Sequence, residues 1–470
     1  MTRDAAIAGA ARYFDEGGFL ADLDRRIGIR TESQAADRAP LLDYLQREIG
    51  PSLARLGFDL HLVPNPAAPG APALIALRQE GDGLPGVLCY GHGDVVLGAP
   101  ERWRAGLDPW RITVEGDRWY GRGTADNKGQ HSINIAAVEQ VLQARGGRLG
   151  FNMAFLVETS EEIGSPGLDE ICAANRDLLA ADVLIASDGP RLDAGRPMIA
   201  LGTRGVINFD LRLTLREGSH HSGNWGGLLP NPATILANAV AALVDARGAI
   251  RVPGLRPPPV PESVRRALAD VAIARDAEGA MLAEGWGEPG LSPAERVFGW
   301  NALEVLAFTA GTPDAPQNAI PPSARVHCQL RFVVGTDVSD LPGTVGAYLE
   351  SQGFRGIEVS ESGTPMPATR LDPDDPWARW AAGSIAATTG AAPMVLPNVG
   401  GSLPNEVFAG TLGLATVWVP HSYGGCRQHG PDEHLLAPLA REGLQMMTGL
   451  FWDLGETGAA VARQRQVHTG

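Results

Sequence analysis

The sequence predicts an α/β fold, with a mixed and mostly parallel sheet flanked by helices, and a smaller α+β unit inserted into it. In the first part of the chain, short apolar runs bounded by glycine and proline alternate with helical patterns, as in a largely parallel sheet. The middle of the chain instead alternates apolar with polar residues, which is typical of strands with one solvent-exposed face. The first pattern returns near the C-terminus, so the middle unit interrupts the larger one.

The larger unit begins with apolar residues at helical spacing within residues 13–56. Buried strands are then expected at 73–77, 87–90, 151–157 and 182–186. Helices are expected at 128–144 and 168–175. After the middle unit we expect a helix at 377–388, a strand at 415–419 and a closing helix at 435–454. These elements assign residues 1–204 and 366–470 to one discontinuous domain.

The middle unit, residues 205–365, contains two alternating runs at 206–215 and 325–333. Its remaining expected elements are helices at 232–243 and 341–351 and a strand at 356–360. The run Pro365-Met366-Pro367 is a candidate hinge back to the larger domain.

The composition is that of a folded globular protein, because 44% of the 470 residues are hydrophobic and 20% are charged. This length favours two or three domains. The net charge of -15 would repel the phosphates of nucleic acids and of anionic membranes, so neither is expected as a partner. The first residues lack the apolar stretch of a signal peptide, and we expect a cytoplasmic protein without a membrane span. The four cysteines form no C-x-x-C pair and are expected in the core.

Four loops of the larger unit contain histidine or acidic residues, and each follows a predicted strand. In an open α/β sheet, ligands bind at the carboxyl ends of the strands, so these side chains should converge on one point. The loops supply His92, Asp94, Asp126, Glu161, Glu162 and Asp188.

These residue types predict a site for two divalent metal ions. Imidazole and carboxylate ligands without a thiolate suit Zn2+, with Mn2+ or Co2+ as substitutes. Two metals roughly 3.5 Å apart can hold a hydroxide and polarise a carbonyl together. Two adjacent glutamates allow one to bind metal while the other accepts the proton of a water molecule.

Several motifs occur in one order along the chain. They are His-Gly-Asp at 92–94, Gly-Arg-Gly-x-x-Asp-x-Lys-Gly at 121–129, Glu-Glu-x-Gly-Ser at 161–165, Asp188, His-Ser-Gly at 221–223, Gly-Gly-Ser-x-Pro at 400–404, and His429. Together they resemble the dinuclear-zinc peptidases and deacylases that include glutamate carboxypeptidase, acetylornithine deacetylase, aminoacylase and carnosinase. The resemblance runs from about the first helix to the last. It implies a zinc-peptidase catalytic domain, with the inserted α+β unit as a lid and dimerisation domain.

The resemblance also implies roles for single residues of the catalytic domain. Asp126 would bridge the two metals, and the peptide bond after it, to Asn127, would be cis. His92 and Asp188 would complete one metal site, and Glu162 and His429 the other. Glu161 would be the general base that produces the metal-bridged hydroxide. Asp94 would hydrogen-bond His92 and orient it.

In the lid, the resemblance implies that His221 reaches into the site of a partner subunit and stabilises the oxyanion. The protein would therefore be a homodimer. Arg331 and Asn318 of the lid would bind the substrate. The guanidinium of Arg331 would pair with the carboxylate of the substrate. In the catalytic domain, the carboxylate end of the substrate would be bound by the backbone N–H groups of Gly400, Gly401 and Ser402.

Several of these candidate residues could instead have a structural role, or have a neighbouring residue that could take their place. Asp126 could cap the helix that follows it, and Glu161-Glu162 could form a solvated acidic turn. His421 and His434 compete with His429, although His434 fits the start of a helix better. His220 competes with His221, Arg331 could form a surface ion pair, and His131 is expected on a helix surface.

The expected reaction is hydrolysis of an amide bond in a small carboxylate-bearing substrate. Many deacylases and carboxypeptidases of the family have glutamate where this chain has Asp188, which favours the dipeptidase and aminopeptidase branch. The alternative is a deacylase or carbamoyl hydrolase of an N-substituted amino acid or a small xenobiotic amide. A non-catalytic ligand-binding descendant is the remote alternative, because every expected ligand position is filled.

Overall fold

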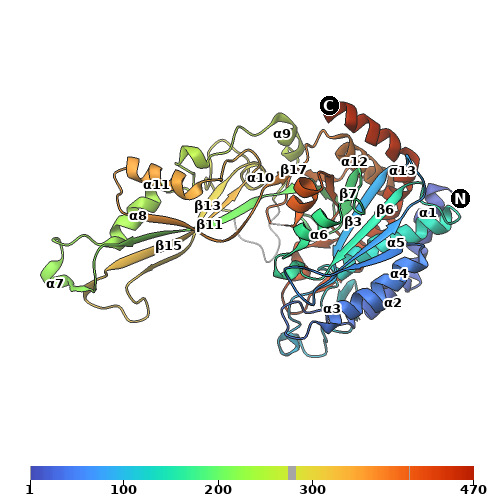
Figure 1. Ribbon diagram of the computed structural model, residues 1–470, viewed down its shortest axis with the longest axis horizontal. Coiled ribbons are helices and arrows are strands. Elements are labelled where there is room, and N and C mark those ends of the chain that lie inside the picture. The colour runs from blue at the N-terminus through green and yellow to red at the C-terminus, as the bar shows by residue number, and fades with distance from the viewer. Residues whose placement is uncertain (1, 274–281, 402, 470) are drawn as a thin grey trace.

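The computed structural model describes residues 2–273, 282–401 and 403–469. It contains a larger unit built on an eight-stranded sheet and a smaller, elongated unit that extends away from it (Figure 1). The predicted α/β fold with an additional small unit is confirmed.

The eight strands of the large sheet lie in the order β1-β2-β6-β3-β7-β19-β9-β18. In that order their bounds are Asp59–Val63, Ala73–Arg78, Asn152–Glu158, Gly86–His92, Val183–Ala186, Ala415–Trp418, Met198–Ala200 and Met394–Leu396. The pairs β6–β3, β3–β7, β7–β19 and β9–β18 are parallel, and the pairs β1–β2, β2–β6 and β19–β9 are antiparallel. The sheet is therefore mixed and mostly parallel, as predicted.

The central strands are apolar throughout because helices cover both faces of the sheet. On β3, Val87 and Cys89 belong to one hydrophobic core, whereas Leu88 and Tyr90 belong to the other. The helices over the first core are α1 (Arg3–Asp15), α2 (Gly18–Ile27), α4 (Gly50–Arg55), α5 (Lys128–Ala144), α12 (Pro376–Thr389) and α13 (Ala437–Thr469). The helices over the second core are α6 (Leu168–Ala174), α9 (Glu262–Leu268) and α10 (Pro293–Phe298).

His131 is not on a helix surface, so that prediction was wrong. It lies in α5, where 15 of the 17 residues are buried because neighbouring helices and β3 enclose the helix. Its Nε2 atom is 2.7 Å from the hydroxyl oxygen of Tyr44. This part of the helix has no solvent-exposed face, so the imidazole of His131 hydrogen-bonds to another buried side chain instead of to water.

His434 does not start a helix either. It begins the short strand β21 (His434–Leu436), which pairs with β5 (Arg118–Tyr120), and α13 starts only after that strand. Pairing with β5 supplies the backbone hydrogen bonds that a helical turn would otherwise provide. The third strand of this small sheet is β4 (Thr113–Glu115).

The smaller unit is a four-stranded antiparallel sheet in the order β13-β15-β11-β16, with bounds Ala302–Ala310, Ser323–Phe332, Gly205–Thr214 and Glu358–Met366. Helices α8 (Pro232–Leu243) and α11 (Leu341–Ser351) pack on one face of this sheet. Along β11, Ile207, Phe209 and Leu211 enter that core, which explains the alternating pattern of the sequence.

The chain passes between the units at several points, and two of these connections run side by side. Strand β10 (Gly202–Thr203) pairs with β17 (Thr369–Arg370) in an antiparallel ribbon. The predicted division into residues 1–204, 205–365 and 366–470 falls beside this ribbon and stays a prediction. Helices α9 and α10, although inside the middle segment, pack into the second core of the larger unit.

All four cysteines are buried and unpaired, which confirms their predicted place in the core. Among the residues that the structure describes, no helix has the length and apolar character needed to cross a bilayer.

Candidate active site

The predicted metal ligands gather at the carboxyl ends of three neighbouring parallel strands. His92 ends β3, Glu161 and Glu162 follow β6, and Asp188 follows β7. Asp126 arrives differently, because its loop connects β5 of the small sheet to α5. The expectation that all four loops follow strands of one sheet was therefore wrong for this loop, although its side chain reaches the same point.

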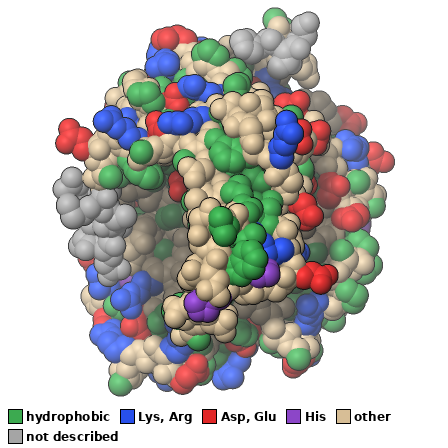
Figure 2. Space-filling view, turned by 90° about the vertical axis from the view of Figure 1, so that its left-hand side faces the viewer, with side chains coloured by type: hydrophobic (Ala, Val, Ile, Leu, Met, Phe, Trp, Pro, Cys, Tyr) green, Lys and Arg blue, Asp and Glu red, His purple; other side chains and the backbone are tan. Residues whose placement is uncertain are grey.

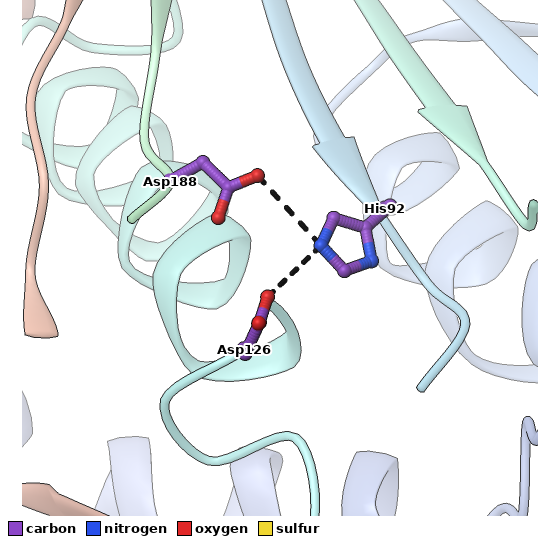
Figure 3. A group of neighbouring side chains, drawn as sticks. All are labelled: His92, Asp126 and Asp188. Atoms are coloured by element: carbon purple, nitrogen blue, oxygen red, sulfur yellow. Dashed lines mark hydrogen bonds and ion pairs between the residues drawn. The ribbon is translucent and has the colours of Figure 1, made fainter. Parts of the chain in front are cut away.

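One group of possible ligands consists of His92, Asp126 and Asp188 (Figure 3). The Nε2 atom of His92 lies 3.1 Å from Oδ1 of Asp126 and 3.7 Å from Oδ2 of Asp188. All three residues are buried. An imidazole nitrogen and two carboxylates thus converge on one small volume.

The second group consists of Asp126, Glu162 and His429. The Nε2 atom of His429 lies 3.1 Å from Oδ2 of Asp126 and 2.9 Å from Oε2 of Glu162. Asp126 therefore presents one oxygen to each group. The backbone φ of His429 is 60°, a left-handed conformation that is uncommon outside glycine.

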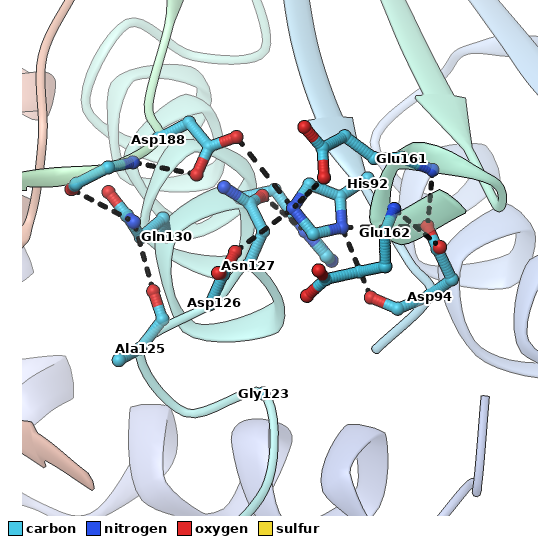
Figure 4. A network of polar contacts seen from close by, with 12 residues as sticks. His92, Asp94, Gly123, Ala125, Asp126, Asn127, Gln130, Glu161, Glu162 and Asp188 are labelled. Carbon is cyan, nitrogen blue, oxygen red and sulfur yellow. Dashed lines mark hydrogen bonds and ion pairs between the residues drawn. The ribbon is translucent and has the colours of Figure 1, made fainter. Parts of the chain in front are cut away.

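Glu161 lies beside both groups, and Asp94 holds the turn on which it stands. The Oε2 atom of Glu161 is 3.9 Å from Nε2 of His92. The backbone N–H groups of Glu161 and Glu162 each donate to one carboxylate oxygen of Asp94, both at 3.1 Å (Figure 4). The Nδ1 atom of His92 meets the backbone carbonyl of Asp94 at 3.1 Å and its carboxylate only at 3.5 Å. Asp94 thus contacts His92 mainly through its carbonyl, while its carboxylate orders the glutamates.

Glu433 is a buried residue that the sequence did not point to, and it shapes the loop of Asp126. Its carboxylate accepts the backbone N–H groups of Gly123, Ala125 and Asp126, each at 3.0 Å, and the guanidinium of Arg122 at 2.7 Å. The next peptide bond, between Asp126 and Asn127, is cis, as predicted. The only signal in the sequence was the position of Glu433 four residues after a candidate ligand.

Burial and crowding of carboxylates change the proton affinity of the cluster. Burial, aided by the charge of Asp126, raises the pKa of Glu162 to about 7 and that of Asp188 to about 6. Burial also raises the pKa of Glu161 well above its usual value. Hydrogen bonds to the neighbouring carboxylates raise the pKa of His429 to about 10. The cluster therefore attracts positive charge, and divalent cations would displace the protons it holds.

The donor set fits two divalent metal ions. In each group the ligand atoms lie within 4.8 Å of one another. The Oε1 atom of Glu162 is buried and has no hydrogen-bond partner among the described residues. A buried acceptor without a donor is costly unless a cation balances it. Imidazole nitrogens and carboxylate oxygens without a thiolate match zinc sites that keep a position for water.

A cavity of about 540 Å³ opens from the cluster. Asp126, Glu161, Asp188 and His429 form its polar end. Gly400 and Gly401 also line it, which places both next to the candidate ligands. Ser402, the third residue expected to bind substrate here, lies outside the described residues.

The residues of the smaller unit that were expected to act at the site are not brought to the cluster within one chain. His221 is exposed on β12 (His220–His221), next to α7 (Ser222–Trp225) at the end of the smaller unit that points away from the large sheet (Figure 1). The backbone carbonyl of Asn318 accepts two hydrogen bonds from Ser222 at that same end. Arg331 is half-buried on β15, and its carbonyl accepts a bond from Arg204 at 3.3 Å.

The competing histidines have other surroundings. His421 is buried, and its backbone N–H donates to the side chain of Gln130 at 2.8 Å. His434 is 2.7 Å from the hydroxyl oxygen of Tyr423. Within the described part of the chain, the ligand groups include His429 and neither of these two.

Comparison with known proteins shows the family to which the chain belongs. A model of peptidase family M20/M25/M40 matches residues 88–453. A cysteinylglycine-S-conjugate dipeptidase of Corynebacterium striatum is 28% identical over 366 residues, which cover 76% of this chain and 77% of that enzyme. A human beta-Ala-His dipeptidase is 33% identical over 223 residues, which cover 47% of this chain and only 43% of that enzyme.

The fold is also similar to that of solved structures. The crystal structure of human carnosine dipeptidase 1 superposes with a TM-score of 0.72 at 22% identity, covering 96% of this chain and 99% of that one. The family match spans most of the chain and includes both ligand groups. The chain belongs to peptidase family M20/M25/M40, and it is a metal-dependent hydrolase of the dinuclear type.

Proposed function

We propose that this enzyme hydrolyses the peptide bond of dipeptides or of similarly small carboxylate-bearing amides. The observation that carries the proposal is the pair of ligand groups that share Asp126, with Glu161 beside both. The relatives named above are dipeptidases, which supports the same substrate class here. Asp188, in place of the glutamate of many deacylases, favours the same branch.

The metal ions are proposed to be Zn2+, with Mn2+ or Co2+ as substitutes. His92, Asp126 and Asp188 would hold one ion, and Asp126, Glu162 and His429 the other. When bound, the ions would polarise the substrate carbonyl and make a water molecule acidic enough to lose a proton near neutral pH.

Glu161 is the proposed general base. It accepts a proton from the attacking water, whose oxygen forms the new bond to the carbonyl carbon. It then donates this proton to the leaving nitrogen as the amide C–N bond breaks. Burial raises the pKa of Glu161, which helps the side chain to retain the proton between the two transfers. The N–H groups of Gly400 and Gly401 are proposed to bind the carboxylate end of the substrate.

The test of this role is Glu161→Gln, which keeps the size of the side chain and removes the base. We expect kcat to fall by roughly 10² to 10⁴-fold while both metals stay bound. Glu170→Gln, an exposed residue on α6, is the matched control and should leave kcat unchanged. Near-normal turnover of the Glu161 variant with its metals bound would refute the mechanism.

A homodimer is proposed as the working form. The edge strand β13 exposes Val305, Leu306 and Phe308 to 41, 54 and 44%. Figure 2, which looks onto the free end of the smaller unit, shows hydrophobic side chains gathered on that face. An exposed apolar edge strand is a ready site for pairing with a second chain. A partner at this end would also give His221 and Asn318 a route to the cluster of the other subunit.

The cytoplasm is the proposed compartment. The support is that all four cysteines are buried and unpaired. Reducing compartments keep thiols in this state.

A further inference from the structure

A second cavity, of about 320 Å³, lies beside the cavity of the metal-binding cluster, and none of the described residues that line it is a candidate metal ligand. Ile273 and Val297 line both cavities. Part of the wall comes from α10, which packs in the second core of the larger unit, and part from Ile250, which belongs to the core of the smaller unit. The second cavity therefore lies at the junction of the two units, where small-molecule sites often occur.

Arg204 brings a positive charge to this second cavity. It lies between β10 and β11 and is only 6% exposed. Among the described residues, its guanidinium makes one hydrogen bond, from Nη2 to the backbone carbonyl of Arg331 at 3.3 Å, and no ion pair with a carboxylate. Burial and the charge of Arg331 lower the pKa of Arg204 to about 10, which leaves it charged at neutral pH. A guanidinium has five N–H groups, so this buried charge lacks most of its partners.

Glu304 brings a negative charge to the same cavity. It is exposed on β13, and within the described part of the chain its carboxylate has neither an ion pair nor a hydrogen bond. Desolvation lowers the pKa of Arg204 and raises that of Glu304, and each charge partly offsets this effect on the other. The two opposite charges are therefore close enough to influence each other but too far apart to pair directly.

The other two charged side chains of the described wall already have hydrogen-bond partners. Arg256 donates to a carboxylate oxygen of Glu288. Arg296 donates to the backbone carbonyls of Glu288 and Trp286 at 2.9 and 2.6 Å. The remainder of the described wall is largely apolar and includes Ile250, Ile273, Pro293, Val297, Trp286 and Trp300. The cavity thus combines two opposite charges that await partners with a surface for a hydrocarbon group.

We propose that this cavity binds a free α-amino acid with an apolar side chain. The carboxylate of the amino acid would pair with the guanidinium of Arg204, and its ammonium group with the carboxylate of Glu304. An α-amino acid carries both charged groups on one carbon atom, so it can bridge two opposite charges that are near each other without touching. The site goes beyond the proposed function, because it is not part of the metal-binding cluster. Only its connection with the reaction rests on that function, since hydrolysis of a dipeptide releases two free amino acids.

Calorimetric titration of the metal-restored enzyme with L-leucine tests the proposal, together with two analogues that each lack one charge. The analogue 4-methylpentanoate lacks the ammonium group, and 3-methylbutylamine lacks the carboxylate. We expect leucine to bind at least roughly tenfold more tightly than either analogue, because each missing charge removes hydrogen bonds between charged groups. Absence of leucine binding, or equally tight binding of 4-methylpentanoate, would overturn the proposal.

Variants distinguish this site from the metal ions, which leucine could also contact. Arg204→Gln and Glu304→Gln each remove one charge, and we expect the Kd for leucine to rise roughly 10- to 100-fold in both. Glu304→Gln should keep the kcat/KM of the unmodified enzyme for a dipeptide. The matched controls are Arg212→Gln on β11 and Glu358→Gln on β16, which change exposed residues outside the cavity and should keep the affinity for leucine.

The outcomes separate this proposal from the proposed function. Unchanged leucine binding in Glu304→Gln would overturn the proposal, because leucine would then be held elsewhere. If Arg204→Gln does not fold, the exposed Glu304 decides the question alone. An unmodified enzyme that binds leucine in this way but hydrolyses no dipeptide would refute the proposed function and leave the amino-acid site standing.

Discussion

Replacing Asp94 tests how the turn that contains Glu161 and Glu162 is held in position. Its two carboxylate oxygens each accept one backbone N–H group, from Glu161 and from Glu162. In Asp94→Asn only one oxygen remains, and the new amide N–H faces the second donor. The backbone carbonyl that meets His92 is untouched by this change. The variant therefore disturbs the two glutamates while it preserves the orientation of the histidine.

The structure also sets the size of the expected effect. A hydrogen bond to a charged group contributes about 1.5–3 kcal/mol. Losing one such bond and weakening the other should cost about 2–3 kcal/mol in the positioning of the turn, which corresponds to roughly a 30- to 150-fold loss of kcat/KM. The assay is steady-state hydrolysis of a dipeptide, with metal content measured on the same sample. Because Glu162 would be displaced, we expect one of the two metal ions to be bound about 10- to 100-fold more weakly.

The control for this experiment is Asp82→Asn, which makes the same change at an exposed loop position. It should leave both kcat/KM and metal binding as in the unmodified enzyme. If Asp94→Asn retained normal kcat/KM and held both metals with normal affinity, then the carboxylate would not order the turn. The reasoning from its two hydrogen bonds would then be refuted.

Two further predictions concern the dimer and the protons of the cluster. Mixing Glu161→Gln chains with His221→Ala chains, each nearly inactive alone, should restore about a quarter of the normal activity after subunit exchange. Half of the dimers would be mixed, and each would contain one complete site. No recovery after confirmed exchange would show that His221 does not act in the partner's site. Zn2+ binding should release more protons at pH 6 than at pH 9, and its affinity should fall as the pH falls. The pKa values of Glu162, about 7, and His429, about 10, mean that the metal-free groups are protonated below those values. Calorimetry in buffers of different ionisation enthalpy measures this release, and heats that did not depend on the buffer would contradict it.

The metal-binding cluster could be anticipated because its residues stand in short motifs at the ends of strands. His92 and Asp188 end or follow two neighbouring parallel strands of one sheet, so topology alone brings them together. Asp126 lies on a loop from another sheet, and its place in the cluster depends on Glu433, which has no motif of its own. The buried carboxylate that orders this loop becomes visible only once the C-terminal segment is folded against it.

Other parts of the fold depend on packing that a local pattern does not reveal. His131 is a polar residue that resembles a surface residue in sequence, yet 15 of the 17 residues of α5 are buried. Strand β13 exposes much of its length, so its burial pattern lacks the alternation that marks a strand. Helices α9 and α10 lie in the middle segment of the sequence but complete the second core of the larger unit. Only the three-dimensional structure shows that α10 supplies part of the cavity wall beside the cluster.

The most direct test of the central claim is metal content measured together with dipeptide hydrolysis. The enzyme would be assayed as purified, after chelation, and after Zn2+, Mn2+ or Co2+ is restored. The two ligand groups that share Asp126 predict about two metal ions per chain, with hydrolysis lost on chelation and regained with metal. A chain that binds no metal, or that hydrolyses dipeptides equally well after complete removal of metal, would contradict the account.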